Sequence, residues 1–146
     1  MFSALHWHLF AQLYEHGFER FNAQYMALDA CSKLAELIDF PGYPKRKIKH
    51  FEIVAELCKC TNVGKPSWGV EKDNVLTVRR NALIHEALYN EQPIGFADSQ
   101  ESFDLNLELQ SFVAKIYLSL LGVRNEYTHS GYAAVGVVGF SYNINI

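Results

Sequence analysis

Apolar residues recur with helical spacing over the first forty residues. A first set is spaced seven residues apart: Trp7, Tyr14, Phe21, Leu28 and Ala35. A second set fills the offset positions: Phe10, Phe18, Tyr25, Cys31 and Ile38. An apolar stripe of this period is typical of a helix that buries one face. The pattern therefore predicts one long helix over residues 1–40, with its aromatic residues in the core. Because the chain opens inside this helix, it is compatible with one domain of a longer protein.

Proline and glycine then divide the chain. Pro41, Gly42 and Pro44 end the first helix, and Pro44 suits the first turn of a second, "KRKIKHFEIVAELCKC". Asp73 or Asn74 can cap a third helix that runs to about Asn90.

A fourth helix is predicted by a second apolar stripe: Leu105, Leu109, Phe112, Ile116 and Leu120. Asp98, Ser99 and Ser102 are its candidate caps. We expect Gly122 to kink this helix and Gly131 to end it.

Four or more amphipathic helices with short connections predict an all-α fold, an antiparallel bundle of four to five helices over residues 1–132. Residues 133–146 are expected to form a short extended tail. At 146 residues the chain is long enough to bury a core as one domain.

Charge and cysteine content narrow the possible partners. The net charge is −3, so a site for a polyanion would have to be a local patch. The predicted start of the second helix carries such a cluster, formed by Lys45, Arg46, Lys47 and Lys49. A solvated helix face and a phosphate-facing, RNA-binding patch both explain it.

The three cysteines have no disulfide spacing, which favours a reducing compartment. Cys58 and Cys60 are too close in sequence for the usual zinc pattern, and neither His16 nor His50 has a carboxylate at ligand spacing. We expect no metal and no cofactor. No apolar run reaches the ~20 residues of a membrane span, and no secretory signal is present, so the prediction is a cytoplasmic protein without membrane contact.

One short pattern of polar residues occurs twice. "VRRNALIHEALYN" contains Arg80, Asn81 and His85, which we call the first motif. "VRNEYTHSG" repeats the spacing with a second motif, given by Arg124, Asn125 and His129.

In an ideal helix Asn81 and His85 share one face, inside an apolar arc, whereas Arg80 lies about 140° around from His85. Buried polar groups need partners. The two side chains are therefore either hydrogen-bonded internally, or they line a cleft or a subunit interface.

The first motif resembles the Arg-polar-x3-His signature of the HEPN superfamily, whose members are compact four- to five-helix bundles in toxins, defence ribonucleases and nucleotide-binding modules. The continuation "RNALIHEALYNEQPIGF" and the segment "LHWHLFAQLYEHGFERFNAQYMALDA" are similar to a bacterial branch that forms the C-terminal part of larger anti-phage and uncharacterised proteins. The resemblance covers most of residues 1–132.

The resemblance implies a homodimeric, metal-independent endoribonuclease that leaves 2′,3′-cyclic phosphate and 5′-hydroxyl ends, with an antitoxin or an N-terminal sensor domain as a possible partner. His85 would accept the proton of a ribose 2′-hydroxyl, Arg80 would stabilise charge on the phosphate, and Asn81 would orient the imidazole or bind a phosphate oxygen. The second motif is an alternative site, and both motifs could share one site if the third and fourth helices pack side by side.

Non-catalytic interpretations also stand. Asn81 and His85 could cap buried backbone or bridge helices, with Arg80 at the surface. Arg124 and His129 could interact with carbonyl groups at a helix C-terminus. The chain would then be a helical module for dimerisation, for binding nucleotide or RNA, or for contact with a partner domain.

Overall fold

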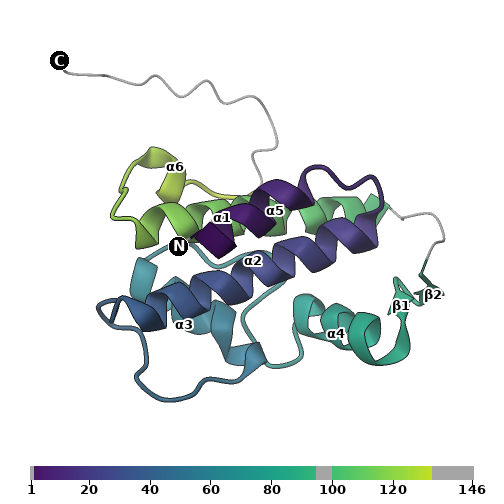
Figure 1. Ribbon diagram of the computed structural model, residues 1–146, viewed down its shortest axis with the longest axis horizontal. Helices are drawn as coiled ribbons and strands as arrows, with labels where there is room; N and C mark the ends of the chain where they lie inside the picture. Colours follow the sequence, from purple (N-terminus) through teal and green to yellow (C-terminus); the bar gives the residue numbers. More distant parts are fainter. Residues whose placement is uncertain (1, 95–99, 133–146) are drawn as a thin grey trace.

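A computed structural model of the protein describes residues 2–94 and 100–132, and these residues are largely helical (Figure 1). The predicted extended tail, residues 133–146, and the candidate caps Asp98 and Ser99 lie outside the described residues. The helices gather around α2 (Gly17–Leu37), which packs against α1 (Phe2–Ala11) and against α5 (Gln100–Leu120).

The prediction of one long N-terminal helix is wrong, because the chain turns between Ala11 and Gly17 and α1 folds back beside α2 (Figure 1). A continuous helix would leave the aromatic stripe without a partner. Folding back buries Ala4 and Ala11 between the helices. In the turn, Arg20 Nη2 donates a hydrogen bond to the carbonyl oxygen of Tyr14 at 2.9 Å.

The predicted fourth helix is confirmed as α5. All five residues of its apolar stripe are buried, and Leu109, Phe112 and Ile116 are fully enclosed. Two details differ. Ser102 lies inside the helix and therefore does not cap it, and the helix ends at Leu120 rather than bending at Gly122. Gly122 has φ +82, the left-handed conformation that commonly terminates a helix.

The second predicted helix begins later than Pro44. A 3₁₀ turn at His50–Glu52 leads into α3 (Ile53–Thr61), and Lys45–Lys49 is not helical. The Glu52 carboxylate fixes this start, because it accepts a hydrogen bond from the backbone N–H of Lys49 at 2.7 Å. The basic cluster therefore lies on an irregular segment before the helix, not on a helical face.

The third predicted helix is shorter than expected. It starts as α4 (Val75–Asn81), and the predicted cap is confirmed, since Asn74 Oδ1 accepts the Thr77 N–H at 2.9 Å. The chain then forms a single π turn at Ala82–Glu86, followed by a hairpin of β1 (Leu88–Tyr89) and β2 (Gln92–Pro93), so the helix does not reach Asn90. A last short helix, α6, spans Glu126–His129.

Candidate functional site

The first motif lies where α4 passes into the π turn. The N–H of Ala87 donates to the carbonyl of Ala82, five residues earlier, and this bond defines the turn. One Arg80 nitrogen, Nη1, donates to Asn81 Oδ1 at 3.0 Å and lies 3.5 Å from His85 Nε2. The three side chains of the motif therefore meet at one point.

This geometry corrects the expectation that Arg80 points far around the helix from His85. In an α-helix, residues four apart are stacked neighbours, whereas the wider π turn brings residues five apart into that relation. Arg80 and His85 are five apart, so the extra residue in the turn places them side by side.

Part of the apolar arc around the motif faces solvent, whereas Tyr89 is buried. Asn81 and His85 are both exposed, and Arg80 is half-buried. Their apolar neighbours are exposed too, with Val78 at 57% and Ile84 at 51%. Asn81 and His85 are therefore not buried, and both are in contact with Arg80 within the chain, as the first alternative expected.

Buried residues hold the motif on both sides. Leu76 anchors α4, and Tyr89 anchors the chain after the π turn. The Tyr89 ring lies 5.8 Å from that of Phe21, and its hydroxyl accepts a hydrogen bond from Nδ2 of the buried Asn106 at 3.1 Å. The π turn is thus fixed against the α2 and α5 core.

Arg80 also reaches polar residues of α2 that the sequence analysis did not single out. Its guanidinium lies 5.9 Å from the centroid of the Tyr25 ring. Burial, helped by the charge of Asp29, raises the pKa of Tyr25 to about 12, and Arg80 opposes this shift. Burial also raises the pKa of Asp29, against the lowering effects of His50 and Arg80.

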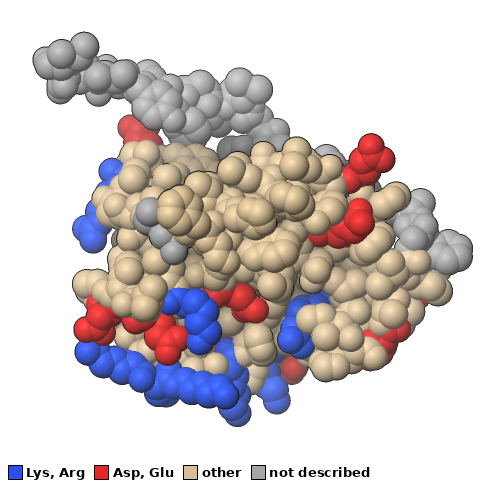
Figure 2. Space-filling view, in the orientation of Figure 1, with Lys and Arg blue, Asp and Glu red and all other residues tan. Residues whose placement is uncertain are grey.

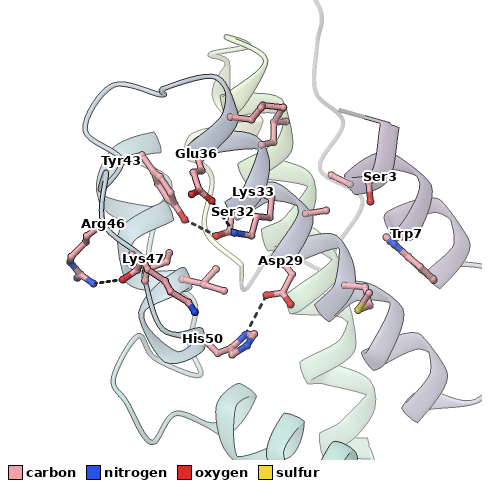
Figure 3. Close-up of a pocket in the computed structure, with 17 residues that line it drawn as sticks. Ser3, Trp7, Asp29, Ser32, Lys33, Glu36, Tyr43, Arg46, Lys47 and His50 are labelled. Carbon is pink, nitrogen blue, oxygen red and sulfur yellow. Dashed lines mark hydrogen bonds and ion pairs between the residues drawn. The ribbon is translucent and has the colours of Figure 1, made fainter.

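Asp29 pairs in turn with His50, whose Nδ1 lies 3.7 Å from Oδ1 of Asp29. His50 therefore has a carboxylate neighbour, although none lies at metal-ligand spacing in the sequence. The two residues are 21 positions apart, on α2 and on the 3₁₀ turn, so no local spacing could have revealed the pair. Both line a pocket of about 510 Å³, which we call the α2 pocket (Figure 3).

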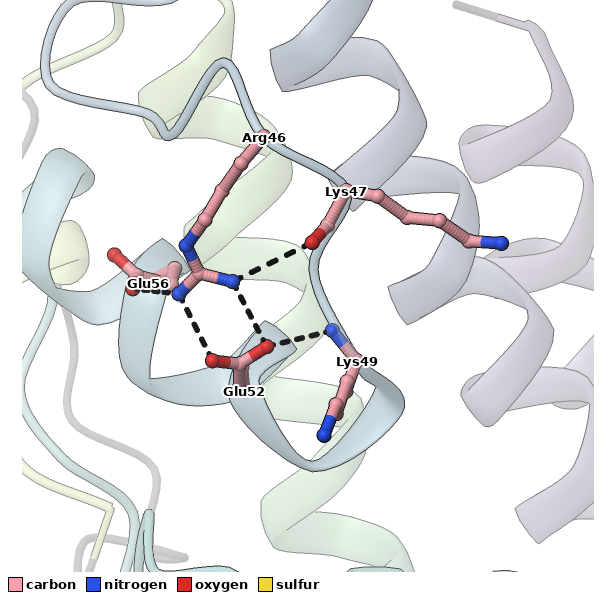
Figure 4. Close-up of polar contacts among 5 residues, drawn as sticks. All are labelled: Arg46, Lys47, Lys49, Glu52 and Glu56. Carbon is pink, nitrogen blue, oxygen red and sulfur yellow. Dashed lines mark hydrogen bonds and ion pairs between the residues drawn. The ribbon is translucent and has the colours of Figure 1, made fainter.

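Two of the four residues of the basic cluster are paired with carboxylates. Figure 2 shows Lys and Arg side chains along the lower edge of the molecule, with acidic side chains beside them. Arg46 makes a bidentate ion pair with Glu52, at 2.8 and 3.0 Å, and also approaches Glu56 (Figure 4). Lys45 pairs with Asp39 at 3.0 Å. An RNA-binding role for the whole cluster is therefore weakened by these local partners.

Two lysines of the cluster have other surroundings. The Lys49 ammonium lies 5.7 Å from the centroid of the Phe51 ring. Lys47 extends from its segment toward α2 and lines the α2 pocket (Figure 3). Among the residues that the structure describes, no carboxylate forms an ion pair with Lys47.

The second motif is arranged differently. Asn125 caps α6, since its Oδ1 accepts the Thr128 N–H at 3.1 Å, and Arg124 and His129 are exposed. Nearby, the buried Lys115 donates to the carbonyl of Ser130 at 2.5 Å and lies 4.3 Å from the centroid of the Tyr132 ring. Desolvation lowers the pKa of Lys115. The segment after α6 is thus tied to α5.

The two motifs do not share a site within one chain. α4 and α6 lie at opposite ends of the molecule (Figure 1). The third and fourth predicted helices therefore do not bring the motifs together, and that expectation is wrong for the single chain. The side-chain oxygen of Asn125 is already hydrogen-bonded in the helix cap, whereas the three side chains of the first motif contact one another.

Within the described ranges, no group of three or more His, Cys, Asp or Glu side chains is placed to hold a metal ion. None of the described helices combines the length and the apolar character that crossing a bilayer requires. No family model matches the chain, and no curated protein or solved structure matches it either.

Proposed function

We propose that the protein is a metal-independent endoribonuclease of HEPN type, an antiparallel helical bundle that acts as a homodimer in toxin or anti-phage defence. The observation that carries the proposal is the contact of Arg80 Nη1 with both Asn81 Oδ1 and His85 Nε2 on an exposed π turn. Single π turns within helices occur frequently at functional sites. A guanidinium beside an accessible imidazole is also the pair of groups that RNA transesterification requires.

The proposed reaction uses these groups in turn. His85 Nε2 accepts the proton of the ribose 2′-hydroxyl, whose oxygen attacks the adjacent phosphorus. Arg80 bonds the phosphate oxygens as charge builds on them. The bond from phosphorus to the 5′-oxygen breaks, and that oxygen takes a proton from the imidazolium of a second His85, supplied by the other protomer. The products are a 2′,3′-cyclic phosphate and a 5′-hydroxyl.

Exposed apolar side chains support the dimer. Val75, Val78 and Ile84 surround the motif and stand 44–57% exposed. Burying them against a second copy would remove apolar surface from water and bring two motifs face to face. A two-fold arrangement would also supply a second imidazole, His85 of the other protomer.

The test is cleavage of mixed RNA by the purified protein in EDTA. We expect His85→Ala, and Arg80→Ala separately, to lower the rate by on the order of 10²–10⁴-fold. Arg124→Ala/His129→Ala is the matched control, with the same residue types at the same spacing, and should retain activity. Equal rates for wild type and His85→Ala would overturn the proposal, as would products without a cyclic phosphate.

A second candidate is a non-catalytic module that dimerises, and the outer face of α1 favours it. Phe2, Leu5 and Leu9 of α1 are 82%, 37% and 52% exposed, and Leu13, in the turn after α1, is 76% exposed. Light scattering on the wild type and on Leu9→Glu/Leu13→Glu separates the candidates. A dimer that these changes dissociate, in a protein without RNA cleavage, supports the module. Cleavage that requires His85 excludes it.

A further inference from the structure

The α2 pocket is lined by residues outside the first motif, and one of them, Asp29, interacts electrostatically with Arg80 of that motif. Its walls come from α1, α2 and the segment that leads into α3 (Figure 3). Trp7 stands on one side and Lys47 on the other, and the lining between them includes apolar side chains such as Met26 and Ile53. The pocket's volume of about 510 Å³ is within the range of small-molecule sites.

Most of the charged residues that line the pocket are already paired. Lys33 bonds Glu36 at 2.9 Å, and Arg46 is held by Glu52 outside the pocket. Two charged groups differ. Lys47 forms no ion pair with any described residue, and Asp29 has a 3.7 Å contact with His50 and longer-range interactions with Arg80 and Lys33.

Asp29 offers an unused hydrogen-bond acceptor. Its Oδ1 is enclosed without a hydrogen bond, and the side chain as a whole is 31% exposed, so the rest of the carboxylate can be reached from the pocket. A half-buried carboxylate whose one donor lies as far away as 3.7 Å is poorly satisfied, and a ligand that brings N–H groups would improve this. His50, the neighbour of Oδ1, is exposed, and a ligand that displaced its side chain would reach both carboxylate oxygens.

These features select a planar heterocycle with N–H donors and a phosphate nearby. An indole can stack on a base, and an ammonium can bind its phosphate. A carboxylate accepts from guanine, whose N1–H and N2–H₂ groups point the same way. It accepts from a single amino group of adenine or cytosine. Uracil presents its one N–H between two carbonyls, which repel a carboxylate.

We propose that the α2 pocket binds guanine, with Asp29 accepting from its N1–H and N2–H₂, Trp7 stacking on the ring and Lys47 binding phosphate. Its position next to the scissile phosphate rests on the proposed function, because Arg80 both contacts His85 and interacts electrostatically with Asp29. Binding of a guanine nucleotide by itself does not depend on cleavage. The source of the base, an RNA strand or a free nucleotide, is distinguished by the two experiments below.

The first experiment is calorimetric titration with GMP, AMP, CMP, UMP and XMP. We expect GMP to bind at least tenfold more tightly than UMP, as one good bidentate contact requires. Asp29→Asn should lose this preference and gain affinity for XMP, because its amide N–H can donate to the 2-carbonyl of xanthine. Glu36→Gln is the control and should keep the preference for GMP over UMP. Equal affinities for all five nucleotides, or an unchanged preference in Asp29→Asn, would overturn the proposal.

The second experiment maps cleavage in single-stranded RNAs that contain one guanine at a variable position. In the wild type, we expect the cleavage position to move with the position of the guanine. In Asp29→Asn, the cleavage position should no longer depend on the guanine. Preferential GMP binding without cleavage means that the pocket serves a free nucleotide and that the nuclease proposal fails. His85-dependent cleavage without base preference, together with no GMP binding, means that the nuclease stands and the guanine site fails.

Discussion

Tyr89 and Asn106 join the segment after the π turn to the buried face of α5. Asn106 Nδ2 donates to the Tyr89 hydroxyl and to the carbonyl of Gly17, both at 3.1 Å, and Asn106 is almost fully buried. One amide thus links α5, the start of α2 and the hairpin that follows the first motif. The position of His85 depends on this link through the short backbone path between residues 85 and 89.

Tyr89→Phe should therefore lower the free energy of unfolding by about 1–3 kcal/mol, because it leaves a buried Asn106 group without one partner. Chemical denaturation measures the change. Tyr117→Phe is a suitable control, since Tyr117 is also on the α5 side of the core and its hydroxyl makes no described hydrogen bond. Equal losses for the two variants would show that the Asn106 contact contributes nothing.

Ala87→Gly should stabilise the protein by roughly 1 kcal/mol. Ala87 ends the π turn with φ +54, a left-handed conformation that costs an L-residue with a Cβ atom about 1–2 kcal/mol. Ala82→Gly, at the helical start of the same turn, should instead destabilise by about 1 kcal/mol. Thermal denaturation of both variants measures the direction of each change in stability. A loss of stability in Ala87→Gly would contradict the left-handed conformation assigned to Ala87.

Asn125→Ala should cost about 1 kcal/mol of unfolding free energy, because Asn125 caps α6. RNA cleavage should stay at the wild-type level, since we place the reaction at the first motif. Denaturation and cleavage are measured on the same preparation. A strong loss of cleavage in folded Asn125→Ala would move the site to the second motif.

The ion pair of Arg46 and Glu52 predicts a dependence of stability on pH. Hydrogen bonds from Arg46, and then from the Lys49 backbone, lower the pKa of Glu52 from 4.5 to about 2. A carboxyl whose pKa is lower in the folded state stabilises the fold above the unfolded pKa. That contribution is therefore present above pH 4.5 and is lost as the pH falls toward 2.

Carbon-detected NMR titration of Glu52 measures this shift directly. In Arg46→Ala the pKa should return toward 4.5, and the loss of stability between pH 4.5 and 2 should become shallower. Lys45→Ala, which removes the neighbouring exposed pair with Asp39, should leave the Glu52 titration unchanged. An ordinary Glu52 pKa in the wild type would show that the bidentate pair does not persist in solution.

Some of the site could be predicted from residues alone. The helical content, the buried stripe of α5 and the Asn74 cap were predictable, because periodicity and capping act between residues a few positions apart. The spacing of Arg80, Asn81 and His85 was visible for the same reason. Their mutual contact was not, since an ideal helix separates Arg80 from His85 and the π turn depends on anchors such as Tyr89.

The sequence by itself determined that the chain is mostly helical and where its polar motifs occur. Tertiary structure alone decided that the first helix breaks to bury Ala4 and Ala11, that Glu52 neutralises Arg46, and that Asp29 meets His50 beside Arg80. The physical reason is how far apart in the sequence the interacting residues lie. Local backbone preferences are written in neighbouring residues, whereas burial and charge pairing depend on which distant segments the fold brings within a few ångströms.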